Sequence, residues 1–207
     1  MPRIAVLTGD LIGSTEVADA VGFRARLAEL LQLTRERFAA LTTLYRGDGF
    51  QIAINDKANA FETALILRVG LIAHSPDPKN RWDARVAIAF GEGRVSATDQ
   101  NSEAFVNSGR ALDGMGKDHL LAYAEAGMLQ LAMGLATSFA DDIINELTPT
   151  EAEALFYYFS NRESHQNIAD RLGKKRPTVT AALQRAKYTL LDRYVLDMDK
   201  LVKQHGE

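Results

Sequence analysis

The 207-residue sequence predicts an α+β domain at residues 1–125, a connecting helix at 126–146 and a small all-α helix-turn-helix domain at 147–207. Two observations carry this prediction. In the first part, short apolar runs alternate with segments of helical periodicity. In the last part, helical patterns follow one another without an intervening strand pattern. A hydrophobic content of 46% is enough for one medium core and one small core.

The first domain opens with a buried strand that ends at Asp10, and a long helix is expected from about Ser14 to Ala40. A hairpin follows, with Asp48 at its tip in a Gly-Asp-Gly turn. The remaining elements are predicted as a helix at 56–74, a strand at 82–90, a glycine turn at 91–93, a short strand at 94–97, a helix at 103–115 and a strand at 120–123. This order predicts a ferredoxin-like βαββαβ sheet with its helices on one face.

The second domain carries strong helix boundary signals. Thr148 before Pro149, with Glu151 three residues after Thr148, predicts a capped helix start. A second helix from about Ser164 should end at Gly173, where a left-handed cap needs no side chain. A third, long helical pattern starts at 177 and predicts a buried stripe at Val179, Ala182, Leu183, Ala186, Leu190 and Leu191.

The other face of this third helix is polar and basic, with the side-chain types that contact phosphates and base edges. The candidate DNA-binding residues are Lys174, Lys175, Arg176, Thr178, Thr180, Gln184, Arg185 and Lys187. Between 165 and 188, six bases against one acid give a local charge of +5, although the whole chain carries −3. A plainer interpretation is that these basic helices only pack on the rest of the protein.

Four runs carry a resemblance to a known family: LTPTE at 147–151, IADRLG at 168–173, TVT at 178–180 and LQRA at 183–186. Together they resemble a sigma-region-4 or LuxR-type helix-turn-helix over the last quarter of the chain. The resemblance implies double-stranded DNA as a partner.

Asp10 and Asp48 are predicted to meet at one edge of the sheet. Paired carboxylates beside a helix start suit Mg²⁺ and nucleotide phosphates, because Mg²⁺ prefers oxygen ligands and phosphates bind helix N-termini. The candidate metal ligands are therefore Asp10 and Asp48, and the candidate phosphate-binding segment is Leu11, Ile12, Gly13, Ser14 and Thr15. Alternatively, Asp10 caps the helix and Asp48 serves only the turn.

The runs GDLIGST at 9–15, RGDGF at 46–50 and GEGRV at 91–95 resemble, in this order, the metal and turn motifs of the class III nucleotidyl cyclases. The resemblance spans residues 3–123 and implies that Asp10 and Asp48 are paired metal ligands in a site between two such domains. Arg46 and Arg110 complete the candidate nucleotide-binding set. Arg110 could instead pair with a neighbouring acid.

The match departs from the cyclases where catalysis and base selection should reside. Asn107 and Arg110 are three residues apart rather than four, and Leu44 stands at the purine-selecting position. The runs EAFVNSGRALD at 103–113 and RGDGFQ at 46–51 are similar to the small bacterial SatD family. These departures count against enzyme activity without excluding it.

The composition excludes several classes. The chain has no cysteine, so disulfide and thiolate chemistry are absent, and its four histidines are too scattered for a zinc pattern. It shows neither an apolar run of membrane-spanning length nor a signal peptide, so we expect a cytoplasmic protein.

These observations predict a DNA-binding transcriptional regulator, and we expect a homodimer. Its cyclase-like domain would sense a nucleotide or second messenger, with Mg²⁺ as a candidate cofactor, or would only dimerise. The alternative is a divergent Mg²⁺-dependent nucleotidyl cyclase, or a related nucleotide-processing enzyme, with a regulatory helical tail. A third possibility is a protein-binding adaptor.

Overall fold

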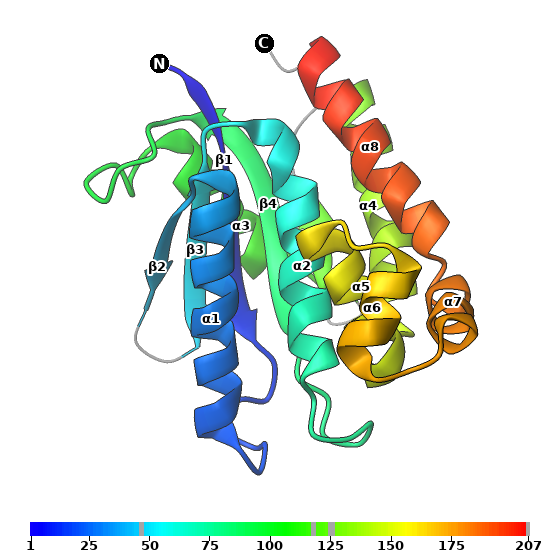
Figure 1. Ribbon diagram of the computed structural model, residues 1–207. Helices are drawn as coiled ribbons and strands as arrows, with labels where there is room; N and C mark the ends of the chain where they lie inside the picture. Colours follow the sequence, from blue (N-terminus) through cyan, green and yellow to red (C-terminus); the bar gives the residue numbers. More distant parts are fainter. Residues whose placement is uncertain (46–47, 117–118, 124–126, 206–207) are drawn as a thin grey trace.

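The computed structural model describes residues 1–45, 48–116, 119–123 and 127–205. Within these ranges a mixed sheet is followed by a run of helices that folds back against it (Figure 1). The strands are β1 (Arg3–Leu11), β2 (Leu41–Leu44), β3 (Gly49–Ile54), β4 (Ala84–Glu92) and β5 (Leu121–Tyr123). The helices are α1 (Ala20–Phe38), the 3-10 turn η1 (Lys57–Asn59), α2 (Ala60–Ala73), α3 (Glu103–Asp113), α4 (Met128–Asn145), α5 (Pro149–Asn161), α6 (His165–Leu172), α7 (Arg176–Arg185) and α8 (Tyr188–His205).

The sheet has the order β2-β3-β1-β4-β5. Neighbours are antiparallel except for β4 and β5, which run parallel and are joined through α3. The first four strands and the helices α1 and α2 therefore form the predicted split βαβ, ferredoxin-like unit, and β5 extends it at one edge. The α+β fold class is confirmed.

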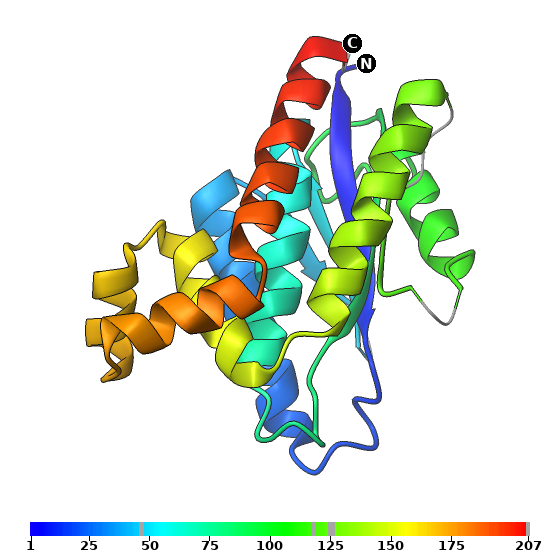
Figure 2. The same cartoon turned by 90° about the vertical axis from the view of Figure 1, so that its right-hand side faces the viewer.

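The prediction that all helices cover one face is wrong. Figure 2 shows α2 and α3 on opposite sides of β1. On β1, Ala5 and Leu7 belong to the main core, whereas Ile4 and Val6 form a second cluster with Ala104 and Phe105 of α3. The strand reads as a continuous apolar run because both of its faces are buried.

Two element boundaries also differ from the prediction. Helix α1 begins at Ala20 instead of Ser14, and the Asp19 side chain caps it by accepting a hydrogen bond from the Gly22 amide (2.8 Å). The preceding residues form turns around Gly13, which has a φ of 61°. The short strand expected at 94–97 is absent from this described segment, which consists of turns and irregular backbone.

The helical half packs on the sheet domain through α5 and α2. Phe156 of α5 approaches α2 where Gly70 leaves room: a Cβ there would lie 2.5 Å from Leu30 and 3.0 Å from Phe156. Buried residues of both halves belong to one continuous core. The predicted capping box of Thr148 and Glu151 is present, and Gly173 has the expected left-handed φ of 61°. The predicted domain limits stay a prediction.

The predicted long third helix is interrupted. Lys187 has a φ of 52°, and the chain turns there from α7 into α8. Ala186 and Leu191 are buried as expected, but Leu190 is 56% exposed. The apolar periodicity crosses the break because α7 and α8 both bury one face in the same core.

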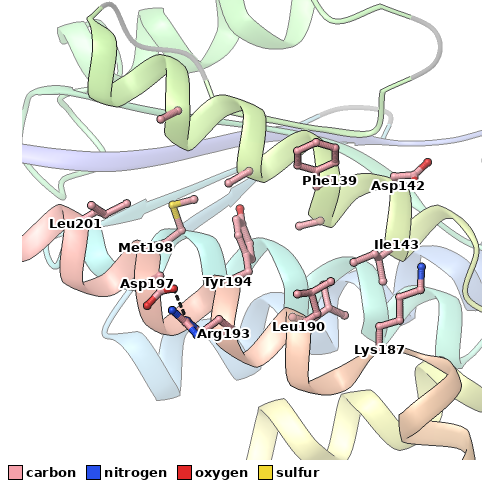
Figure 3. Close-up of a pocket in the computed structure, with 14 residues that line it drawn as sticks. Phe139, Asp142, Ile143, Lys187, Leu190, Arg193, Tyr194, Asp197, Met198 and Leu201 are labelled. Atoms are coloured by element: carbon pink, nitrogen blue, oxygen red, sulfur yellow. Dashed lines mark hydrogen bonds and ion pairs between the residues drawn. The ribbon is translucent and has the colours of Figure 1, made fainter.

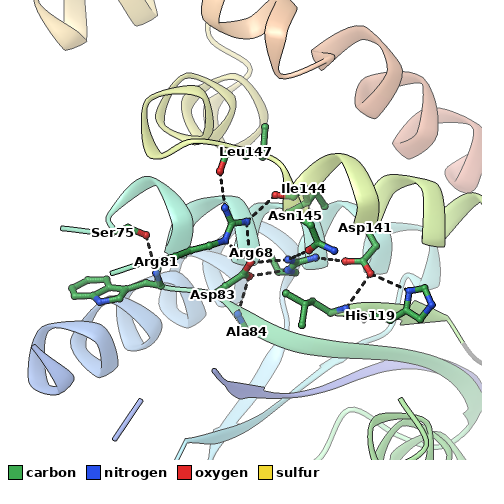
Figure 4. A network of polar contacts seen from close by, with 12 residues as sticks. Arg68, Ser75, Arg81, Asp83, Ala84, His119, Asp141, Ile144, Asn145 and Leu147 are labelled. Atoms are coloured by element: carbon green, nitrogen blue, oxygen red, sulfur yellow. Dashed lines mark hydrogen bonds and ion pairs between the residues drawn. The ribbon is translucent and has the colours of Figure 1, made fainter. Parts of the chain in front are cut away.

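A buried network of charges fixes α4 to the sheet domain (Figure 4). The Arg68 guanidinium on α2 has no exposed surface and donates to Asp83 (2.7 Å), to Asp141 of α4 (2.6 Å) and to Asn145 (2.8 Å). Burial by itself lowers the pKa of Arg68, but the two carboxylates outweigh it and raise the pKa. Arg81 donates to the main-chain oxygens of Ile144 and Leu147 at the end of α4. In the described part of the chain, no helix is both long enough and apolar enough to cross a membrane.

Candidate functional site

Asp10 lies at the end of β1, opposite Arg85 of β4 in the sheet register. Arg85 donates two hydrogen bonds to its carboxylate, Nε to Oδ1 at 2.9 Å and Nη2 to Oδ2 at 2.5 Å. Both side chains are about one-third exposed, at 32% and 38%. The hydrogen bond to Asp10 raises the pKa of Arg85, and the nearby Asp113 of α3 adds to this effect. The first candidate metal ligand is thus engaged in a bidentate ion pair.

Asp48 is held on the side of α1. The buried Ser14 hydroxyl donates to Oδ2 of Asp48, and Arg24 Nε of α1 donates to Oδ1 at 3.2 Å. The Asp48 carbonyl oxygen also accepts a hydrogen bond from the Leu11 amide (3.2 Å). Asp48 therefore ties the hairpin to the segment after β1 and to α1.

The two carboxylates have separate partners at the same edge of the sheet. Asp10 shares its face of β1 with Thr8, which contacts Ser108 of α3 at 2.7 Å, so Asp10 lies on the α3 face. Asp48 pairs with α1, on the other side. Among the described residues no hydrogen bond or ion pair joins Asp10 to Asp48, and no group of three or more acidic or histidine residues could hold a metal. Each of the two carboxylates is therefore engaged by an arginine of the protein itself, and their role as metal ligands stays a prediction.

The predicted phosphate-binding segment does not lie at a helix N-terminus, because α1 begins at Ala20. The Leu11 and Ile12 amides donate to the carbonyl oxygens of Asp48 and Asp83, which takes both away from a phosphate. Ser14 is buried against Asp48, while Gly13 and Thr15 are exposed in the turns.

Of the two arginines in the candidate nucleotide-binding set, only Arg110 lies within the described residues. Arg110 is exposed on α3, one turn before the Asp113 that acts on Arg85. Arg46 lies outside the described residues. The structure adds Arg24 and Arg85, which the sequence analysis missed. Arg85 follows only from the register of β1 against β4, and Arg24 only from the true start of α1.

The second candidate surface is formed by α6, the turn at Gly173 and α7. Ile168 and Ala169 of α6 pack with Val179 and Leu183 of α7 in the buried core, which sets the angle between the two helices. The outward residues at the start of α7 are Lys175, Arg176 and Thr178, and Gln184 is exposed further along. The start of α7 therefore combines cationic side chains with the positive end of a helix dipole.

Thr180 has a different place from the rest of the predicted set. It is half-buried, and its hydroxyl lies 3.0 Å from His165 Nδ1 of α6. Its contact therefore braces α6 against α7.

Several of the basic side chains on this surface have acidic partners within the protein. Lys174 pairs with Glu153 at 2.9 Å, Arg185 with Glu151 at 2.8 Å and Arg171 with Glu163 at 2.7 Å. These three glutamates lower the local charge from +5 to +2. Burial raises the pKa of Glu151, but hydrogen bonds from Thr148 and Arg185 outweigh it and the net pKa is lowered, so this glutamate stays charged.

Three cations of the predicted DNA-binding set remain unpaired. Lys175, Arg176 and Lys187 are exposed and have no acidic group within ion-pair distance in the part of the chain that the structure describes. These are the charges that a polyanion could contact without displacing an internal partner.

Comparisons with solved structures find similarity for somewhat more than half of the chain. A bacterial light-regulated adenylyl cyclase is 12% identical, covering 58% of this chain and 74% of the other, with a TM-score of 0.46. The active GGEEF domain of a diguanylate cyclase from Vibrio cholerae is 15% identical, covering 60% and 85%, also with a TM-score of 0.46.

Sequence comparisons point to the helical half. No curated protein matches the chain. The family described as Sigma-70, region 4 matches residues 140–190, which run from the last turns of α4 through α5, α6 and α7 into α8. The match indicates that α6 and α7 form a helix-turn-helix of the DNA-binding kind, similar to sigma-70 region 4.

Proposed function

We propose that the chain is a transcriptional regulator that binds double-stranded DNA through α6 and α7. Its cyclase-like domain senses a nucleotide or second messenger, dimerises, or does both. The observation that carries the proposal is the exposed start of α7, where Lys175 and Arg176 have no internal acidic partner, in a segment that matches sigma-70 region 4. With this role we also propose a cytoplasmic location.

The geometry suits a helix that enters the major groove. In helix-turn-helix proteins the second helix contacts base edges with its N-terminal residues. Thr178 and Gln184 are exposed on α7 and offer hydroxyl and amide groups for such contacts, while Lys175 and Arg176 suit phosphates. These four side chains are exposed in the structure, in which α5 docks on α2.

A homodimer would give the helix-turn-helix a second half-site. Two recognition helices bind half-sites about 34 Å apart, one turn of duplex. A ligand that changes the relation between the two copies would change DNA affinity. The same coupling requires DNA to change ligand affinity by the same factor.

The first experiment is a binding titration of the full chain with the DNA upstream of its own gene, at two salt concentrations, with and without nucleotides and Mg²⁺. We expect specific binding that weakens as salt rises, because phosphate contacts release counterions. The double variant Lys175→Ala, Arg176→Ala should lose it, whereas Lys79→Ala, in an exposed loop, should not. Absence of specific DNA binding in every condition would refute the proposal.

For the effector we propose a nucleotide, with Mg²⁺ as a candidate cofactor, at the edge formed by Asp10, Arg85, Asp48 and Arg24. Both ion pairs must open before the carboxylates can bind a cation. The variant Asp10→Asn separates two ways of binding, measured by calorimetry with a triphosphate in the presence and absence of Mg²⁺. If Asp10 binds the metal, the variant loses Mg²⁺-dependent affinity. If Arg85 binds phosphate directly, the freed arginine binds more tightly. Unchanged affinity in Asp10→Asn, Asp48→Asn and Arg85→Ala would exclude this edge.

The alternative from another class is a divergent Mg²⁺-dependent nucleotidyl cyclase or related enzyme. It requires product formation from a nucleoside triphosphate that Asp10→Ala and Asp48→Ala abolish. Turnover that depends on both residues would replace the sensor in the proposal by an enzyme.

A further inference from the structure

Helices α4 and α8 present a large apolar surface, which we call the α4–α8 face. On α4 the exposed residues form one stripe: Met128 is 83% exposed, Leu131 69%, Leu135 59% and Phe139 65%. Leu190, at the start of α8, is 56% exposed. These spacings of three and four residues place the α4 side chains in one row along the helix.

A groove of about 490 Å³ lies beside this stripe, between α4 and α8 (Figure 3). Its α4 wall is formed by the small residues Ala132, Ala136 and Ala140. Leu191, Tyr194 and Met198 line its α8 side, and the Tyr194 hydroxyl lies 2.9 Å from that of Thr137. Phe139 lines the groove and also belongs to the stripe, so the two features form one continuous surface.

The shape of this surface is self-complementary. On α4, large residues at 131, 135 and 139 form a ridge along one row of four-residue spacing. Alanines at 132, 136 and 140 form the adjacent row and leave a furrow. Helices pack by placing the ridge of one into the groove of the other, and a twofold interface uses the same patch on both subunits. One copy therefore offers both the ridge and the groove that a second copy needs.

The charges on this face argue against other occupants. Helix α4 contains no lysine or arginine, whereas helices that lie on membranes carry them on the polar face. A small apolar ligand in the groove would leave Met128, Leu131 and Leu135 in water. The groove rim carries Asp142 and Asp197 together with Lys187 and Arg193, so two copies need not oppose like charges.

The area is of the size that a dimer buries. The α4 stripe and Leu190 together expose on the order of 400 Å² of apolar surface, before the groove walls are counted. One side of a standard interface buries about 800 Å², of which a little over half is apolar. Monomeric proteins rarely expose a larger contiguous apolar patch than a few hundred Å².

We propose that the α4–α8 face is a homodimer interface in which the α4 ridge of each copy packs into the groove of the other. The inference deepens the homodimer of the proposed function and rests on it. Because only two residues, Ala186 and Lys187, separate the end of α7 from the start of α8, a dimer joined through α8 sets the separation of the two α7 helices. The interface thereby determines which spacing of DNA half-sites the protein can read.

The test is the mass of the full chain in solution, by light scattering or sedimentation equilibrium. The wild type should be a dimer at tens of micromolar, and Leu131→Glu and Leu135→Glu should each weaken dimerisation by at least ~100-fold, because each buries an unpaired charge. Both positions face solvent in the monomer, so the fold is retained, as circular dichroism will show. The control Val21→Glu changes an apolar residue that is 79% exposed on α1, and it should stay dimeric. A monomeric wild type, or a dimer that neither variant weakens, overturns the proposal.

Cross-linking gives an independent test, because the chain contains no cysteine. A twofold interface centred on α4 brings the residues nearest its axis next to their equivalents in the other copy, so Leu135→Cys or Phe139→Cys should form a disulfide-linked dimer under mild oxidation, and Val21→Cys should not. A dimer of wild type that lacks both cross-links overturns the assignment of this face. A dimer without DNA binding supports this inference and refutes the proposed function, whereas DNA binding by a monomer does the reverse.

Discussion

The start of α7 and the edge of the sheet at Asp10 and Asp48 differ in what their charges do inside the protein. At α7, Lys175 and Arg176 are exposed and unpaired among the described residues. At the sheet edge, each aspartate already pairs with an arginine. The first surface can bind a polyanion as it stands, while the second must open two ion pairs before it binds anything. A motif therefore predicts where a charged residue lies, but not whether that charge is available.

The largest effect should come from Arg68, which joins α2 of the sheet domain to α4. The variant Arg68→Met leaves Asp141 buried without its arginine and leaves Asp83 with Arg81 alone, so we expect the free energy of unfolding to fall by about 3–5 kcal/mol. Urea denaturation followed by far-ultraviolet circular dichroism and by the fluorescence of the single tryptophan, Trp82, measures it. Coincident transitions would show that the sheet domain and the helices unfold together; separate transitions would support the predicted domain limits.

The matched control is Arg26→Met, which removes a partly exposed arginine paired with Glu29 on α1. It should change stability by less than about 0.5 kcal/mol. A loss in Arg68→Met no larger than in this control would show that the buried network contributes little.

The second effect tests whether the charges at the start of α7 bind DNA and those at the sheet edge do not. The variant Arg176→Ala should weaken DNA binding by roughly tenfold at moderate salt and reduce the slope of log affinity against log salt by about 0.9, because one phosphate contact is lost. Arg85→Ala, at the sheet edge, should leave both quantities unchanged. Filter binding or fluorescence anisotropy at several salt concentrations gives the slope. An unchanged slope in Arg176→Ala, or an equal loss in Arg85→Ala, would break the distinction between the two regions.

Local signals made the helix-turn-helix predictable. Thr148 and Glu151 cap α5 within one turn, and Gly173 supplies the left-handed cap of α6. Each of these signals depends on residues a few positions apart. The order of the strands along the chain was predictable for the same reason, apart from the strand expected at 94–97, since each strand and turn has its own pattern.

Contacts between distant residues explain what the sequence analysis missed. The pairing of Asp10 with Arg85 joins residues 75 positions apart and depends on strand register. The pairing of Lys174 with Glu153 and of Arg185 with Glu151 requires α5 and α7 to be placed in space. The break at Lys187 is hidden because the apolar pattern continues on both sides of it. The placement of α3 on the second face of the sheet could have been predicted from the uninterrupted apolar run of β1, because such a run indicates a strand buried on both faces.

The third effect concerns Lys174, a basic side chain whose charge the protein itself neutralises with Glu153. The variant Glu153→Gln removes the carboxylate that holds Lys174, so this lysine becomes available to DNA phosphate. We expect DNA affinity to rise by about two- to fivefold, because an exposed pair of this kind is worth less than about 1 kcal/mol. Glu29→Gln, on α1, is the matched control and should not change DNA affinity. Affinity that stays the same or falls in Glu153→Gln would mean that Lys174 lies outside the DNA interface.

The smallest effect concerns the junction that holds the helix-turn-helix on the sheet domain. His74 follows α2, its ring meets that of Phe156 of α5 edge to face at 5.8 Å, and its Nδ1 donates to the Gly70 carbonyl oxygen (2.7 Å). Burial lowers the pKa of His74, against the raising effect of that hydrogen bond; Arg26 also lowers it, and Glu153 and Glu29 raise it. The folded protein therefore holds this histidine neutral more strongly than the unfolded chain does.

The sign of the pH dependence follows from this difference. The contribution of neutral His74 to the free energy of unfolding is fully present above its unfolded pKa of about 6.5. It is lost as the pH falls through the lower folded pKa, because the unfolded chain then binds a proton that the native state resists. Between about pH 7.5 and pH 5.5 the Tm of the wild type should fall by a few degrees more than the Tm of His74→Phe, which keeps the ring and cannot titrate. Equal slopes for the two proteins would show that the junction between α2 and α5 does not respond to protonation of His74. The ion pairs at the sheet edge should be unchanged in His74→Phe, so a difference in the pH dependence of the Tm arises at the junction that holds the helix-turn-helix.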